Sequence, residues 1–598
     1  MIALLAVMIL SALYAGCLLR VGWVPSDEGT LAQSAMRVYQ GQLPQRDFTE
    51  IYTGGLSFIH AAAFHLFGVN LLSLRIAACF FFVIWVAAVY YMARRMLAPL
   101  GAALVTLTAV SWSYPNYPAA MPSWYNLFFA SFGAAALLRY IDVRTRRWLF
   151  VAGVCGGASI LIKIIGVYYV AAVLMFLLFV EQSNSLFTLP RKACGVYRVV
   201  CSALLGLYLV LLTGVVWPEI WDGAIYNFLL PSALCVALLL WRERKPSARS
   251  SMERFSRLFA LVIPFLLGVV IVIALYLIPY VASHSVALLI HGVMGSASAR
   301  MVGLAGRQHA PSIGDACYGL VTLALILFAL YSMRAQKKIA AVLIALGLTA
   351  VLGCSIFLQG LQDTWLMAGT FTPLAVLLGV AMIVAGPRWG SGAEHARQRI
   401  MLLIALAAMC SLVQYPVPYV TYFCYAAPFV LLATVAAVAS RSYVPGKNIL
   451  SVLLVFFLAF GIFAMVAKHI YAPELRVSRL QPLILPRAGG LMIDPTTTPR
   501  YDEVVPFLQA HSPNGLLYAG NDCPELYFLS GLKNPTRDDT GAPLADVLAA
   551  LRSGELQLVA LNDESFFQSG AASPELRNAV VSALPHTTKI GRFSIYWR

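Results

Sequence analysis

The sequence contains few charged residues and even fewer acidic ones. Only 11% of its 598 residues are charged, against about 25% in soluble globular proteins. Asp and Glu number 26, whereas Lys and Arg number 42. This scarcity excludes a water-soluble fold for most of the chain. Hydrophobic residues make up 60%, many of them in runs of about 20 residues, the length that crosses a bilayer. The composition therefore predicts a polytopic α-helical membrane protein.

Several chemical signatures are also missing. The 11 cysteines show neither a Cys-x-x-Cys motif nor a Cys/His metal spacing, which argues against a zinc site and a disulfide framework. There is no P-loop and no Rossmann glycine fingerprint, so no nucleotide-sugar site is expected. We predict no metal site and no certain cofactor, although an acidic loop near the N-terminus leaves a divalent cation open.

The excess of basic residues gives the chain a net charge of +16, which could suggest a nucleic-acid partner. The placement of the charges argues against nucleic acid, because the basic clusters lie in short gaps between apolar runs. This is the positive-inside pattern of cytoplasmic loops. The clusters are residues 93–96, 144–148, 241–257, 333–338, 387–399 and 441–447.

The apolar runs predict about 13–15 transmembrane helices. An odd number places the N-terminus inside and the C-terminal tail outside, in agreement with the basic clusters. The long outer loops are then 20–69 and 282–313. The candidate spans are 1–19, 70–92, 98–113, 122–140, 148–162, 165–181, 199–216, 226–241, 258–281, 314–332, 339–358, 364–386, 400–414, 422–440 and 449–467.

The composition changes near residue 470, which divides the chain into a transmembrane core, 1–469, and a small α/β domain on the outer face, 470–598. Short apolar segments at 515–520 and 556–563 are typical of buried strands, and 588–598 alternates like a final strand. Residues 499–511 and 543–554 have helical periodicity.

The first outer loop gathers acids in a chain that has few. In "SDEGTLAQSAMRVYQG" (26–41), Ser26 is predicted to cap a helix whose first turn holds Asp27 and Glu28. One interpretation is that these acids only complement the helix dipole. The other is that an ionised Asp27 faces a cavity at the membrane surface and takes a proton from an acceptor hydroxyl.

Lys163 lies between two predicted spans, where a buried cation is costly and needs a partner. It either extends to the interface or holds a lipid phosphate. Arg300 and Arg307, in the small-residue loop 282–313, are either solvated or part of a phosphate-binding lid. Outer-side aromatic and amide residues are candidates for either an interfacial belt or a sugar pocket. These are Trp124, Tyr125, Asn126, Gln414, Tyr415 and Tyr419.

Residues 25–75 resemble the first outer loop of the GT-C glycosyltransferase superfamily, most of all the branch of protein O-mannosyltransferases and lipid A aminoarabinose transferases. The segment 524–537 is similar to one in the tails of that branch. The resemblance implies that Asp27 is the catalytic acid, with Glu28 in the same motif and Asp47 as a second acid nearby. A Lys is common near the position of Lys163, which favours the phosphate role. The residues that carry the resemblance are Asp27–Glu28, Gly41, Arg46–Asp47–Phe48, Phe67–Gly68 and Arg75.

The sequence departs from that pattern at "YTGGLS" (52–57), where many relatives have a proline-rich run. Tyr52 is a candidate for the sugar or acceptor pocket, and the departure puts its role in doubt.

The function expected from these features is an inverting membrane glycosyltransferase. It would move a sugar from a polyprenyl-phosphate donor to a glycolipid, polysaccharide or protein acceptor. The expected location is the cell inner membrane, with the C-terminal domain in the periplasm and membrane lipids as partners. A transporter or lipid flippase is an alternative, although no internal repeat supports it. A lipid-linked polysaccharide polymerase or ligase is a third possibility.

Overall fold

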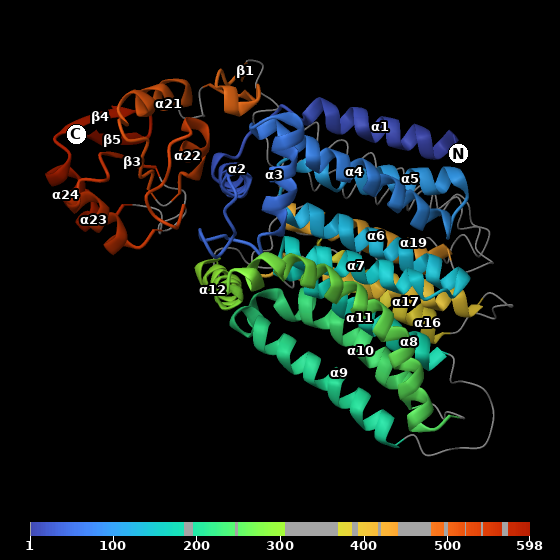
Figure 1. Ribbon diagram of the computed structural model, residues 1–598. Helices are drawn as coiled ribbons and strands as arrows, with labels where there is room; N and C mark the ends of the chain where they lie inside the picture. The colour runs from blue at the N-terminus through green and yellow to red at the C-terminus, as the bar shows by residue number, and fades with distance from the viewer. Residues whose placement is uncertain are drawn as a thin grey trace.

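The computed structural model shows a helical bundle with a smaller domain at one end (Figure 1). That domain, residues 480–598, is called the C-terminal domain below. The first helix begins at the opposite end of the bundle (Figure 1). The structure describes residues 2–183, 195–244, 249–304, 369–385, 393–416, 420–439, 480–495, 500–520, 522–539, 542–564 and 572–598.

Most of the predicted spans are confirmed as helices. In the described part of the chain, seven helices are long and apolar enough to cross a membrane: α4, α6, α8, α9, α10, α11 and α17. The predicted spans 314–332, 339–358 and 449–467 lie outside the described residues. The bundle helices are α1 (Ile2–Leu18), α4 (Leu71–Arg94), α5 (Pro99–Ser111), α6 (Pro122–Val143), α7 (Arg147–Ile162), α8 (Val167–Ser183), α9 (Gly195–Val216), α10 (Leu230–Glu243), α11 (Ser251–Ala282), α16 (Phe371–Val384), α17 (Ala393–Cys410), α18 (Val420–Cys424) and α19 (Ala427–Ala439).

Both of the long loops that were predicted to lie outside contain helices. Loop 20–69 holds α2 (Pro25–Tyr39), as predicted, and also α3 (Gly55–Phe67). The prediction of a loop over 282–313 is wrong for its first part, because α12 (Val286–Leu304) occupies it. The glycine, alanine and serine residues of α12 suggested a loop, yet in membrane proteins such residues often form helices that pack closely. α12 lies across the end of the bundle on the side of α2 (Figure 1).

Helices α7 and α11 pack backbone to backbone. A Cβ atom added at Gly153 would collide with the carbonyl oxygen of Phe265 in α11. In lipid there is no hydrophobic driving force that brings helices together. Close van der Waals packing between small residues therefore supplies much of the free energy of helix association. The α7–α11 contact therefore holds α7, which ends just before Lys163, against the rest of the bundle.

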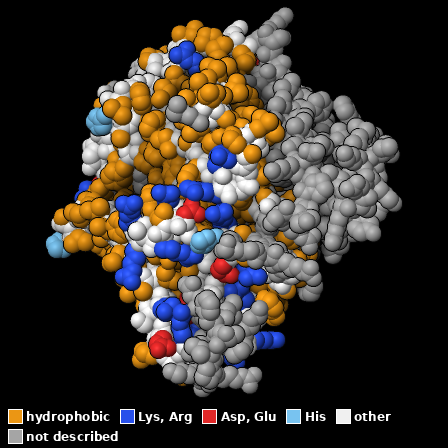
Figure 2. Space-filling model, turned by 90° about the vertical axis from the view of Figure 1, so that its right-hand side faces the viewer, with side chains coloured by type: hydrophobic (Ala, Val, Ile, Leu, Met, Phe, Trp, Pro, Cys, Tyr) orange, Lys and Arg blue, Asp and Glu red, His pale blue; other side chains and the backbone are white. Residues whose placement is uncertain are grey.

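Basic side chains gather at the end of the bundle opposite the C-terminal domain, with few acids among them (Figure 2). One predicted basic loop, 241–257, is shorter than expected because Ser250 caps α11 and forms a capping box with Glu253. Arg254 thus lies inside the helix, buried between Glu181 and Glu243 at 2.7 and 2.5 Å.

The C-terminal domain is a small α/β unit, as predicted. Its three-stranded antiparallel sheet has the order β3-β5-β4. The predicted single last strand is instead a hairpin, which turns at Gly591. The predicted strand 515–520 forms only isolated bridges, such as Tyr518 with Val559. The elements are β1 (Gln481–Pro482), β2 (Met492–Ile493), α21 (Tyr501–Ala510), α22 (Pro524–Ser530), α23 (Leu544–Arg552), β3 (Leu558–Asn562), α24 (Pro574–Ala583), β4 (His586–Ile590) and β5 (Phe593–Trp597).

Candidate functional site

Helix α2 carries the predicted acids in its first turn, as expected, but it starts two residues earlier than predicted. Its N-cap is Val24, followed by Pro25, and no side chain caps it. The prediction that Ser26 is the N-cap is wrong, because a proline at the first helical position already fixes the helical backbone there. Asp27 and Glu28 remain in the first turn, where the helix dipole favours negative charge.

Glu28 forms a buried ion pair with Arg75 of α4. The guanidinium donates Nε to Oε1 at 2.7 Å and Nη2 to Oε2 at 2.6 Å. Arg75 also donates to the carbonyl oxygens of Leu19, Val21 and Gly22. Both side chains are almost fully buried. This bidentate arrangement gives Glu28 a structural partner on both oxygens and ties the start of the first loop to the bundle.

Asp27 points in a different direction and accepts a hydrogen bond of 2.6 Å from the hydroxyl of Tyr117. Burial, and next the charge of Asp27, raise the pKa of Tyr117 well above its usual value. The phenol therefore keeps its proton and serves as a donor to Asp27. Asp27 is only partly buried, unlike Glu28.

The other two acids of the loop hold its backbone. Asp47 binds Arg46 at 2.7 Å and accepts from the amide of Leu43 at 2.7 Å. The hydrogen bond from Arg46 is the main reason that the pKa of Asp47 lies below its usual value. Glu50 is buried, which raises its pKa, and it accepts from Ser57 Oγ at 2.7 Å. Asp47 therefore shapes the loop, and Glu50 supports the segment that follows it.

Lys163 lies in the break between α7 and α8 and lines a cavity of about 870 Å³, with the open mouth included. Its ammonium group is 3.2 Å from Ser123 Oγ and lies over the rings of Tyr52 and Tyr422, at 5.6 and 5.8 Å from their centroids. Tyr415 lines the same cavity. The structure thus brings together Lys163, Tyr52 and Tyr415, three of the predicted site residues.

The wall of this cavity, called the lysine cavity below, also reaches the lipid-facing side of the bundle. Val215 of α9 and Ile164 line it and are 41% and 38% exposed. α12 contributes Val293 and Ala297. A cation among aromatic rings, next to apolar side chains open to lipid, suits a charged head group attached to a long hydrocarbon tail.

Asn126 lines a smaller adjoining cavity, which shares Ile165, Tyr168 and Val413 with the lysine cavity. Its Nδ2 donates to Ser159, at 2.7 Å to Oγ. Within the described part of the chain, its buried Oδ1 has no hydrogen-bond partner. A buried acceptor without a partner is costly, so this atom is suited to receive a hydrogen bond from a ligand hydroxyl.

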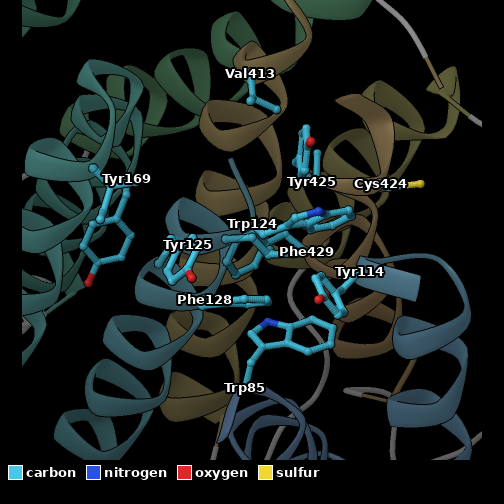
Figure 3. Packing of buried hydrophobic residues seen from close by; sticks show 14 of the residues in the cluster. Trp85, Tyr114, Trp124, Tyr125, Phe128, Tyr169, Val413, Cys424, Tyr425 and Phe429 are labelled. Atoms are coloured by element: carbon cyan, nitrogen blue, oxygen red, sulfur yellow. The ribbon is translucent and has the colours of Figure 1, made fainter. Parts of the chain in front are cut away.

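Trp124 and Tyr125 are core residues instead of pocket residues. Both are fully buried and pack with Trp85, Tyr114 and Phe128 in one aromatic cluster (Figure 3). Their predicted position in the sugar pocket or the interfacial belt does not fit this burial. The apolar surroundings of the two rings explain the difference, since Trp85 of α4 and Tyr114 pack against the start of α6 there.

The remaining predicted residues are placed only in part. Gln414 is buried, and its Nε2 donates to the carbonyl of Ser411 at 3.2 Å. It is not part of the described lining of either cavity. Arg300 belongs to α12, but its side chain lies outside the described residues, as do Arg307 and Tyr419.

The C-terminal domain holds the first loop from the other side. α22 packs on α2 so closely that a Cβ atom at Gly29 would lie 2.5 Å from Cβ of Glu525. Arg37 of α2 pairs with Asp539 at 3.1 Å. Arg537 donates to the carbonyl of Arg46 at 2.6 Å. The segment 524–539, part of which suggested the resemblance, therefore contacts the loop that carries Asp27.

Sequence reasoning missed several residues of this region. Tyr117 and Tyr422 lie in stretches rich in aromatics, where nothing distinguishes a functional ring from a packed one. Thr53 lines the lysine cavity, and in the described part its buried hydroxyl has no partner. Tyr425 connects the parts, since its ring lies 5.7 Å from that of Tyr422 and 4.3 Å from that of Trp124.

The chain resembles two solved membrane proteins in structure. ArnT from Cupriavidus metallidurans bound to undecaprenyl phosphate is 13% identical, with a TM-score of 0.40 covering 100% of this chain and 97% of ArnT. The oligosaccharyltransferase of Archaeoglobus fulgidus is 11% identical, with a TM-score of 0.43 covering 94% of this chain and 70% of the other. Both TM-scores lie below 0.5. A comparison with curated protein sequences gives no significant match.

A family model gives sequence evidence. Residues 55–211 match the model of dolichyl-phosphate-mannose-protein mannosyltransferases. The matched segment runs from α3 through α9 and includes Lys163 and Asn126, but it begins after Asp27. It is therefore independent of the acidic motif in which the resemblance was first seen, and it covers about a quarter of the chain.

Proposed function

We propose that the protein transfers a sugar from a polyprenyl-phosphate donor to an acceptor on the outer side of the membrane. The observation that carries this proposal is the lysine cavity, where Lys163 lies among Tyr52, Tyr415 and Tyr422, next to side chains exposed to lipid. A phosphate bound by Lys163 would leave the sugar as a stabilised anion. The hydrocarbon tail would remain along the apolar side of the bundle.

The sugar is proposed to occupy the adjoining cavity. Asn126 Oδ1 in this cavity and the Thr53 hydroxyl in the neighbouring lysine cavity both lack partners in the described structure, so they are available for sugar hydroxyl groups. Tyr168 lines both cavities and can pack against the sugar ring. The anomeric carbon would then lie between the phosphate at Lys163 and an incoming acceptor oxygen.

Asp27 is the proposed base that receives the acceptor proton. It does not line either cavity among the described residues, and its connection to them runs through aromatic side chains. Tyr117 donates to Asp27, and Tyr425 and Tyr422 continue from that region to Lys163. A single displacement with this arrangement inverts the anomeric centre. Glu28 and Asp47 position the loop in this mechanism, although the resemblance placed them with the catalytic acids.

Replacing Lys163 by Ala is expected to weaken donor binding while leaving the protein folded. Loss of one charge-assisted contact costs about 1.5–3 kcal/mol, or roughly 10- to 150-fold in affinity. Binding of a polyprenyl-phosphate sugar to the purified variant, measured by calorimetry, tests this. The matched control Lys163→Arg keeps the charge and should retain most of the affinity. Unchanged donor affinity in a folded Lys163→Ala protein would mean that the lysine only extends to the interface.

The C-terminal domain is expected to face the periplasm or an equivalent outer space, because the basic side chains gather at the opposite end of the bundle (Figure 2). Arg500 is exposed, so an Arg500→Cys variant should react with a membrane-impermeant maleimide added to intact spheroplasts. A cysteine in place of exposed Arg94, at the basic end, should react only after lysis. The opposite labelling pattern would reject both the topology and the proposed mechanism.

A further inference from the structure

A third cavity, separate from the two described above, lies between the second half of α2 and the C-terminal domain. Its volume is about 880 Å³ with the mouth included. Gln33 and Met36 of α2 line it together with Gln40, the residue that follows α2, since residues three and four apart share a helix face. The C-terminal domain contributes Tyr527 and Asn534. Amide groups beside an aromatic ring are the side chains that commonly hold sugar hydroxyls and sugar faces.

Three cations also line this cavity: Arg37, Arg487 and Lys533. Arg37 is neutralised by Asp539. Arg487 donates to the carbonyl of Phe528 at 2.7 Å, and within the described structure neither it nor Lys533 pairs with a carboxylate. Burial lowers the pKa of Arg487, as expected for a desolvated cation without a counter-ion.

The described lining contains no acidic residue. The cavity therefore combines an uncompensated positive charge with several amide groups in a space large enough for a sugar. A guanidinium group binds phosphate oxygens through parallel hydrogen bonds, and an ammonium group adds a mobile point charge.

We propose that this cavity binds a phosphate-bearing sugar, with the phosphate at Arg487 and Lys533 and the hydroxyls at the amides of Gln33 and Gln40. Soluble sugar phosphates and phosphorylated head groups of lipids share this chemistry. The site is distinct from the proposed donor site, because its lining shares no residue with the lysine cavity.

Calorimetry on the full-length protein in a neutral detergent tests the soluble ligand. Glucose 6-phosphate should bind saturably, and glucose at the same concentration should not. Lys533→Gln should weaken binding about tenfold, since one charge-assisted contact is lost. Lys533 is exposed, and the fold uses only its backbone: the amide donates to the carbonyl of Gly515, and the carbonyl accepts from the amide of Leu517. Lys589→Gln, which removes an exposed lysine elsewhere on the same domain, is the matched control and should bind normally.

The lipid arm of the test uses phosphatidylcholine nanodiscs with and without phosphatidylinositol phosphate. If only the binding of glucose 6-phosphate depends on Lys533, the ligand is a soluble sugar phosphate. If only the binding to nanodiscs with phosphatidylinositol phosphate depends on Lys533, the ligand is a lipid head group. If the wild type binds neither probe, or if Lys533→Gln binds as well as the wild type, the proposal is wrong. The assay requires no turnover, so its failure leaves the proposed glycosyl transfer untouched, and an inactive transferase leaves this binding untouched.

Discussion

Replacing Asp27 by Asn is expected to lower turnover about 10²–10⁴-fold, the usual contribution of a positioned proton acceptor. The amide keeps the size of the side chain and an oxygen that can accept from Tyr117, so the fold should be retained. Donor binding should also survive, because the proposed phosphate contact is at Lys163. Turnover of a polyprenyl-phosphate sugar, donor affinity and the melting temperature of the purified variant together check this expectation.

Two further variants make the test specific. Tyr117→Phe removes the hydrogen bond to Asp27 but no charge, so it should reduce turnover less than Asp27→Asn does. Asp546→Asn removes an exposed acid from the C-terminal domain and should leave turnover unchanged. Full activity in Asp27→Asn would show that Asp27 is not the base. Its role would then be to complement the helix dipole, which contributes about 0.3–1 kcal/mol of stability.

Replacing Arg75 by Met is expected to destabilise the protein by about 3–5 kcal/mol, because a buried carboxylate loses its partner. The carbonyl oxygens of Leu19, Val21 and Gly22 lose their donor as well. Glu28→Gln should also be strongly destabilising, since it leaves the guanidinium buried without a counter-ion. Thermal unfolding in detergent, followed by circular dichroism, measures both losses.

The matched control is an exposed ion pair of the same type. Arg500 binds Glu503 at 2.5 Å, with side chains 61% and 51% exposed. Exposed pairs contribute at most about 1 kcal/mol, so Arg500→Met should hardly change the melting temperature. If Arg75→Met unfolds no more easily than Arg500→Met, the Glu28–Arg75 pair does not stabilise the first loop as argued above.

Most helices of the bundle could be predicted because each one depends on a continuous stretch of the sequence. Each described span coincides with an apolar run, and α2 was visible from its first-turn acids and its helical spacing. α12 was missed because Gly, Ala and Ser are ambiguous between a loop and a closely packed helix. The hairpin of β4 and β5 was missed because alternation continues on both sides of Gly591, where only the backbone angle shows the turn.

The site was predictable only in part, because its contacts join distant segments. Lys163 stood out as a lone cation between apolar runs, and Tyr52 as an aromatic residue after acids. Nothing in the sequence separates the role of Glu28 from that of Asp27, since the difference depends on Arg75, 47 positions along the chain. Trp124 and Tyr125 have the composition of a sugar platform, but the neighbouring helices bury them.

The length of α7 determines how deep in the membrane Lys163, the proposed phosphate ligand, lies. α7 has 16 residues, from Arg147 at the basic end to Ile162, just before Lys163. At 1.5 Å per residue it spans about 24 Å, less than the roughly 30 Å hydrocarbon core of a bilayer. Lys163 therefore lies several ångströms below the plane where lipid phosphates normally rest. Under the proposed function, a polyprenyl phosphate that binds Lys163 would have to move below that plane, or the bilayer would have to thin around the protein, so membrane thickness would help to determine which lipids serve as donors.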